Sequence, residues 1–135
     1  MSDRESFDHH RLHVYRLATT FFRESYRLSQ PIRRDDSFLR YQFLRAALSI
    51  KANIAEGAGD IQPKEKARFY RIARRSAHES AVLLEEVEFL LLSDKGVCDQ
   101  LYAMLRRIML ALGRKMEARG RSAGPRRKPT RKTTK

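Results

Sequence analysis

The sequence predicts an all-α protein, an antiparallel up-down-up-down four-helix bundle in residues 1–119 with a disordered basic tail in residues 120–135. Apolar residues recur at spacings of three and four along successive stretches, which is typical of amphipathic helices. The breaks between these stretches are short, so consecutive helices should run antiparallel. The tail lacks large apolar residues and cannot bury enough surface to offset the entropy of ordering.

The first helix follows from an apolar stripe near the start of the chain. This stripe consists of Val14, Leu17, Phe21 and Leu28. Pro31 should end the helix, because the residue before a proline is disfavoured in helical conformation. Ser37 or Asp36 is then expected to cap a second helix that runs to Glu56. Gly57 would stand just past the end of that helix.

The third and fourth helices are bounded in the same way. Pro63 suits the first turn of a third helix, which we expect to reach Ser93 and to be closed by Gly96. The fourth helix should fray near Arg119. Its apolar face consists of Leu101, Leu105, Ile108 and Leu112.

Charge is the strongest compositional signal. The 135-residue chain has 29 Lys and Arg against 16 Asp and Glu, a net charge of +13, which favours polyanionic partners. The tail from Gly120 holds seven basic residues and no acidic ones. The single cysteine, Cys98, excludes an internal disulfide and fits a reducing compartment. With no signal-peptide pattern and no apolar run of about 20 residues, we expect a cytoplasmic protein that does not enter a membrane.

A polar stripe on the second helix is the most unusual feature. It consists of Gln42, Arg45, Ser49, Asn53 and Glu56, which share one helical face. Both flanks of this stripe are apolar, so the helix should be buried on most sides. We expect Glu56 to pair with Arg68 or Arg45 in a buried network that fixes helix register, because an unpaired buried carboxylate is costly. A ligand or catalytic pocket is the alternative interpretation.

The third helix supplies further members of this network. Arg68, Arg75 and Glu79 lie roughly on one side of that helix, with Ser76 adjacent. Ser49 or Asn53 of the second helix could supply the remaining hydrogen bonds to Glu56. The predicted polar network is therefore Arg45, Ser49, Asn53, Glu56, Arg68, Ser76 and Glu79.

Three strings carry a family resemblance. "LRAALSIKANIAEGAGD" and "KARFYRIARRSAHES" resemble the 23S ribosomal RNA intervening-sequence proteins, as does "HHRLHVYRLA" near the start. The resemblance covers about residues 7–115. More distantly, the chain is similar to the accessory variability determinants of diversity-generating retroelements. The residues that match the family signature are Ser49, Asn53, Ile54, Ala55, Glu56, Gly57, Arg68, Phe69, Ser76 and Glu79.

The resemblance implies a four-helix protomer assembled as a ring, commonly a homopentamer. It also implies a role as an accessory factor to an RNA-handling enzyme, since the retroelement relatives bind nucleic acid and a reverse transcriptase. Arg75 departs from the family pattern, because many members have glycine there. The resemblance brings no catalytic residue and no cofactor.

Candidate sites for chemistry are few. His13 could share a helical face with His9 or with His10, but a zinc site needs a third ligand and usually a fourth, so we expect no metal. "EGAGD" follows a helix rather than a strand and is not a phosphate loop. Cys98 has no nucleophile signature around it. We therefore predict that the protein is not an enzyme and needs no cofactor.

Nucleic-acid binding through phosphates is the function that the charge favours. The expected binding residues are basic side chains of the third helix and of the tail: Arg71, Arg74, Arg75, Arg126, Arg127, Lys128, Arg131 and Lys132. RNA and DNA both remain open as targets. The aromatic residues are expected on core stripes, which argues against a base-stacking surface. A structural or protein-interaction bundle is the alternative function.

Overall fold

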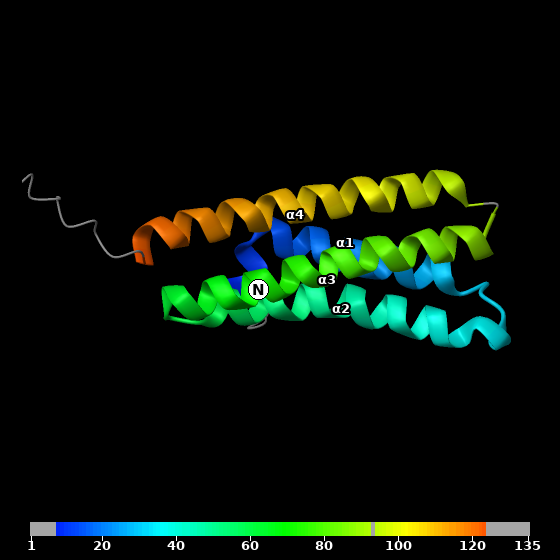
Figure 1. The fold of residues 1–135 in the computed structure, drawn as a ribbon, viewed down its shortest axis with the longest axis horizontal. Helices are drawn as coiled ribbons and strands as arrows, with labels where there is room; N and C mark the ends of the chain where they lie inside the picture. The colour runs from blue at the N-terminus through cyan, green and yellow to red at the C-terminus, as the bar shows by residue number, and fades with distance from the viewer. Residues whose placement is uncertain (1–7, 93, 124–135) are drawn as a thin grey trace, which may run out of the picture.

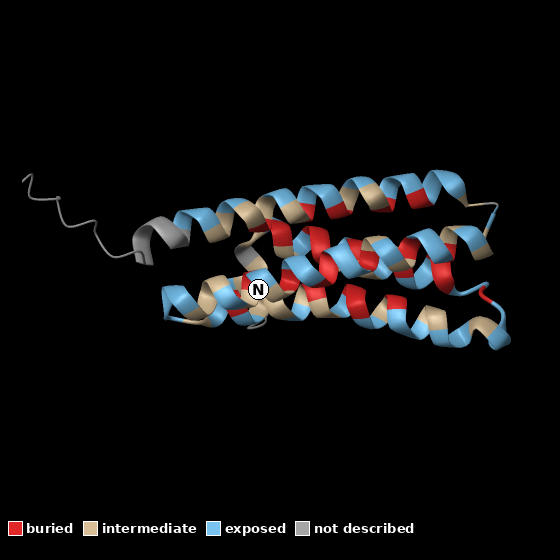
Figure 2. Ribbon diagram, viewed as in Figure 1, coloured by how far each residue is buried: buried red, intermediate tan, exposed pale blue. Residues whose placement is uncertain are grey.

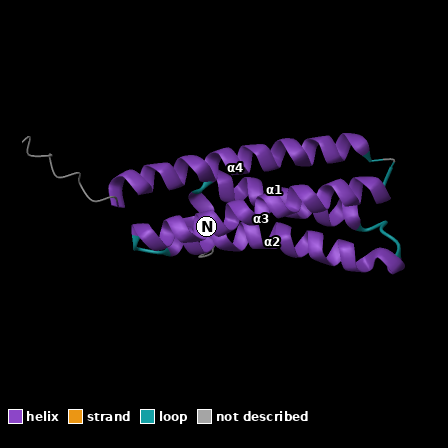
Figure 3. Cartoon of the chain, in the orientation of Figure 1, coloured by secondary structure: helices purple, strands orange, loops and turns teal. Residues whose placement is uncertain are grey.

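The computed structural model describes residues 8–92 and 94–123. These residues form four α-helices: α1 (His13–Ser29), α2 (Ser37–Gly59), α3 (Pro63–Leu90) and α4 (Lys95–Ala123). Two short 3₁₀ helices, η2 (Asp8–Arg11) and η3 (Arg34–Asp36), precede α1 and α2. The described residues contain no strand (Figure 3), so the all-α prediction is confirmed.

The helices form an antiparallel four-helix bundle (Figure 1). Helix α1 packs against α2 and α4, and α3 packs against the same two helices. Helices α1 and α3 therefore occupy opposite corners, as in an up-down-up-down bundle. The predicted topology is confirmed.

The core is one continuous apolar cluster along the bundle axis (Figure 2). Each helix supplies buried residues at spacings of three and four. The expected stripes of α1 and α4 are both buried. At the α1–α2 contact, the rings of Phe21 and Phe43 meet edge to face with centroids 6.3 Å apart.

Helix α2 ends differently from the prediction. It continues to Gly59, so Gly57 is inside the helix rather than past its end. No described glycine has a positive φ. The carbonyl groups at the end of α2 have another partner, because the ammonium of Lys66 on α3 donates to Gly57 O at 3.0 Å and Ala58 O at 2.9 Å. A lysine at this position also compensates the negative end of the helix dipole.

Other predictions about where the helices begin and end are also corrected. Helix α3 ends at Leu90 rather than Ser93, because Leu91 has a non-helical backbone conformation. Gly96 lies in the first turn of α4, and Asp36 precedes α2 without a side-chain cap hydrogen bond. Helix α4 continues past Arg119 to Ala123, and no proline interrupts the sequence between Arg119 and Pro125. The rest of the predicted tail, residues 124–135, lies outside the described residues.

Candidate functional site

A chain of small polar residues joins α2 to α3. The Oγ atoms of Ser49 and Ser76 are 2.7 Å apart and share a hydrogen bond. The side-chain amide of Asn53 donates to Ser49 O at 2.9 Å and to Ser49 Oγ at 3.1 Å. Ser76 is buried, and Ser80 donates back to its carbonyl oxygen at 2.8 Å. Because buried hydroxyls need partners, these contacts constrain how α2 and α3 pack.

The charged residues of the predicted network do not join this chain. Arg45, Glu56, Arg68 and Glu79 are all exposed. Arg68 donates to Glu65 at 3.0 Å within α3 and lies over the Phe69 ring. The expected buried ion pair of Glu56 is therefore wrong. The prediction assumed that both apolar flanks of α2 are covered, whereas one flank faces solvent.

Gly57 has a packing role that explains the glycine after Glu56. A Cβ atom at position 57 would lie 2.6 Å from Cε1 and 2.9 Å from Cδ1 of Tyr70. Tyr70 is only 1% exposed, so its ring cannot move away. On the Tyr70 ring lies Lys115 of α4, with Nζ 5.8 Å from the centroid. The Glu-Gly pair thus places an exposed carboxylate beside a close helix–helix contact.

The two flanks of α2 have different environments. Phe43, Ala47, Ile50 and Ile54 are buried in the core. Leu44 and Ala55 of the other flank are half-buried, and Leu48 and Ala52 are exposed. The second flank therefore forms molecular surface.

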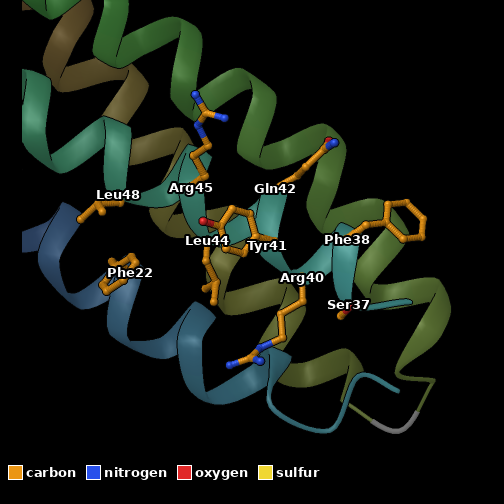
Figure 4. Close-up of a pocket in the computed structure, with 9 residues that line it drawn as sticks. All are labelled: Phe22, Ser37, Phe38, Arg40, Tyr41, Gln42, Leu44, Arg45 and Leu48. Atoms are coloured by element: carbon orange, nitrogen blue, oxygen red, sulfur yellow. The ribbon is translucent and has the colours of Figure 1, made fainter. Parts of the chain in front are cut away.

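This surface includes an open groove of about 990 Å³, which we call the aromatic groove (Figure 4). Its lining residues are Phe22, Ser37, Phe38, Arg40, Tyr41, Gln42, Leu44, Arg45 and Leu48. Phe38 is 64% exposed and Tyr41 is 75% exposed. In Figure 4, Phe22 of α1 and Leu44 and Leu48 of α2 meet between the two helices. The expectation that the aromatic residues lie only on core stripes is therefore wrong, because Phe38 and Tyr41 lie on the exposed side of α2.

A second depression lies along the same pair of helices, with a volume of about 400 Å³. We call it the basic hollow. Its lining residues are His10, Tyr15, Arg16, Thr19, Thr20, Arg23 and Lys51. Its lining residues Arg23 and Lys51 are close in sequence to Phe22 on α1 and Leu48 on α2, which line the aromatic groove. Among the described residues that line these two depressions, none is Asp or Glu.

Two cation–π contacts connect α1 and α2. The Arg40 guanidinium lies 5.7 Å from the Tyr26 centroid, and the Lys51 ammonium lies 5.4 Å from the Tyr15 centroid. Such contacts leave the cation its full charge. Sequence reasoning missed this alternation of cations and aromatics because the residues come from two helices.

The other predicted binding residues lie elsewhere. Arg71, Arg74 and Arg75 are exposed on α3, the helix that lies diagonally opposite α1 in the bundle. Arg126, Arg127, Lys128, Arg131 and Lys132 lie outside the described residues.

Acidic residues gather near the end of α3 and the start of α4. Burial raises the pKa of Tyr102 to about 12, and the carboxylates of Glu88 and Glu85 add to this shift. The pKa of Cys98 is also raised, first by burial and then by Glu88. Charge is therefore distributed unevenly over the bundle.

The histidines near the N-terminus pack as aromatic rings. The His9 ring centroid lies 4.3 Å from that of His10 and 4.6 Å from that of Tyr15. Burial lowers the pKa of His9, and the neighbouring His10 adds to this effect. His13 Nε2 lies 3.4 Å from the guanidinium of Arg107 on α4. Within the described ranges, no three His, Cys, Asp or Glu residues come close enough to hold a metal ion.

Fold and surface define a small helical-bundle protein with a polar α2–α3 contact and strongly cationic outer faces. The family model of the 23S rRNA-intervening sequence protein matches residues 10–114, and the chain belongs to this family. No curated protein gives a significant match. The more distant resemblance to the retroelement accessory determinants stays a prediction. No helix in the described part of the chain combines the length and apolar character needed to cross a membrane.

Proposed function

We propose that this protein is a non-enzymatic, homo-oligomeric bundle that binds RNA or DNA through phosphates. The observation that carries the proposal is the exposure of Arg71, Arg74 and Arg75 on the outer face of α3. Three guanidinium groups within two turns form a cationic surface suited to a phosphate backbone. The basic residues of the tail would add to the same attraction.

Assembly into a ring is the second part of the proposal. Val82 is 51% exposed, Phe89 is 71% exposed and Leu110 is 61% exposed. Large apolar side chains at the surface often mark protein–protein contacts. A ring, by family resemblance a pentamer, would cover such residues and repeat the Arg71 surface around its axis, which multiplies binding by avidity. The resemblance further suggests a reverse transcriptase or another RNA-handling enzyme as partner.

The test of binding uses fluorescence anisotropy with labelled RNA and DNA over a range of salt concentrations. The slope of log affinity against log salt should change by about 0.9 for each phosphate neutralised on duplex DNA. Deletion of residues 124–135 leaves α4 complete and should reduce both affinity and slope. Replacing Arg71, Arg74 and Arg75 with Ala should reduce them further. Absence of binding to either nucleic acid at low salt would overturn the proposal.

The test of assembly is light scattering with size-exclusion chromatography. An oligomer is expected for the full chain and for the 124–135 deletion. A species of 15.8 kDa at micromolar protein concentration would refute the ring.

A structural or protein-interaction bundle is the second candidate function. It is favoured by the exposed Val82 and Phe89, which lie on α3 near Glu85 and Glu86 rather than near the cations. If deletion of residues 124–135 alone removes all nucleic-acid binding, the helices are a scaffold and this second function is correct.

A further inference from the structure

We infer that the aromatic groove and the basic hollow together form a binding surface for single-stranded nucleic acid. Bases would stack on Phe38 and Tyr41, and phosphates would lie against the cations that line both depressions. This inference rests on the proposed nucleic-acid binding and assigns it a surface on α1 and α2. It also specifies that the bound strand is unpaired.

The aromatic side chains have the exposure that stacking requires. Phe38 and Tyr41 are three residues apart on α2, so their rings lie on the same outer face of this helix. With 64% and 75% exposure, both rings leave one face available to a flat ligand. In Figure 4 the Tyr41 ring stands out from α2 next to Leu44, and the Phe38 ring stands out near the start of the helix, pointing away from Leu44 and Leu48. An aromatic face accepts any base, so stacking here would be tolerant of sequence.

The cations supply the complementary charge. Arg40 and Arg45 flank Tyr41 on α2, and Arg16, Arg23 and Lys51 continue the positive surface into the basic hollow. From Phe38 to Lys51 the surface follows α2 over thirteen residue-to-residue steps, about 20 Å at 1.5 Å per step. No described lining residue of either depression is acidic. A ligand for this surface must combine flat apolar groups with regularly spaced negative charge, as a single strand does.

A duplex would use only half of this surface. Its bases are paired and stacked inside the helix, so its phosphates could contact the arginines while Phe38 and Tyr41 stayed unused. The groove should therefore prefer single strands, whereas the Arg71 surface of α3 should bind both forms alike. This difference separates the two surfaces experimentally.

The central experiment measures anisotropy of a labelled oligonucleotide of about 12 nucleotides, a length within the ~4–16 nucleotides that single-strand-binding folds cover. The full chain should bind oligo(dT) more tightly than a duplex of equal length. The double variant Phe38→Ala and Tyr41→Ala should weaken single-strand binding about 5- to 140-fold for each base unstacked. Duplex binding should be unchanged. The matched control is Ile61→Ala, which removes a large exposed apolar side chain from the connection between α2 and α3, outside both depressions, and should change neither affinity.

A fluorescent reporter tests contact directly. The chain contains no tryptophan, so Tyr41→Trp introduces a single indole into the groove and keeps an aromatic face there. This variant should retain wild-type affinity, and oligo(dT) should quench its emission. Phe89→Trp provides the control and should show no quenching.

Three results would overturn the inference. Unchanged single-strand affinity of the double variant, while the protein still binds nucleic acid, would refute the groove and leave the proposed function intact. Loss of the oligomer in the double variant would identify the groove as a contact between copies of this chain. Absence of any nucleic-acid binding by the full chain would refute this inference and the proposed function together.

Discussion

The contact between Gly57 and Tyr70 gives the sharpest prediction for stability. Gly57→Ala places a methyl group 2.6 Å from Cε1 of Tyr70, closer than carbon atoms can approach. The Tyr70 ring is 1% exposed and is held by the core on its other side. Overpacking of this kind costs about 1 to 3 kcal/mol. Alanine also gains about 1 kcal/mol over glycine in helix propensity, which partly offsets the cost.

Gly113→Ala is the matched control that isolates the propensity gain. Gly113 lies inside α4, and a Cβ atom there would meet nothing within 4 Å. We therefore expect Gly113→Ala to stabilise the protein and Gly57→Ala to be about 1 to 3 kcal/mol less stable than this control. The corresponding difference in Tm is roughly 4 to 12 °C for a domain of this size.

The assay is urea denaturation followed by circular dichroism, at one fixed protein concentration because assembly would shift the transition. In a Tyr70→Leu background the added methyl group no longer meets a ring, so Gly57→Ala should cost little there. Equal stability of Gly57→Ala and Gly113→Ala in the wild-type background would refute the proposed role of Gly57.

Three further predictions concern the α2–α3 contact, the exposed Glu56 and the acidic end of the bundle. Ser76→Ala should cost about 1 kcal/mol of unfolding free energy by removing the 2.7 Å hydrogen bond to Ser49, and the double variant with Ser49→Ala should cost less than the sum of the two. Glu56→Ala should change the free energy of unfolding by less than about 0.5 kcal/mol, because the Glu56 side chain is exposed. A loss of several kcal/mol would instead support the hypothesis that Glu56 forms a buried ion pair. Stability should fall as pH rises from 10.0 to about 12, because Tyr102 ionises at its ordinary pKa when unfolded but stays protonated in the fold. Tyr102→Phe should flatten this decline in an alkaline melting series, and an unchanged decline would show that Tyr102 does not cause it.

The fold was predictable because each helix carries an apolar stripe that the bundle buries. The apolar stripes from Val14 to Leu28 on α1 and from Leu101 to Leu112 on α4 could be recognised from the sequence of each helix alone. The site was less predictable, because α2 has two apolar flanks and its sequence does not specify which one is covered. This ambiguity produced the wrong burial of Glu56. The sequence predicted that Ser49 and Ser76 belong to one polar network, but it did not predict the hydrogen bond between their side chains.

The aromatic groove was missed for a related reason. Phe38 and Tyr41 have the residue types of a core, and only their angular position around α2 shows that they face outward. The cation–π contacts of Lys51 with Tyr15 and of Arg40 with Tyr26 can be recognised only when α1 and α2 are seen together. A surface built from two helices cannot be recognised from either helix alone.

The order of the helices has a consequence for folding. Helix α2 is joined to α3 by residues 60–62, and α3 to α4 by residues 91–94, so most packing partners are close in sequence. Such local topologies fold quickly, because little loop-closure entropy is lost before contacts form. Helix α1, the shortest at 17 residues, reaches α4 only after the chain has reversed three times. Its amides should therefore exchange with deuterium earlier than those of the α2–α3 hairpin, and the contact between α1 and α4 should be the last part of the molecule to become complete.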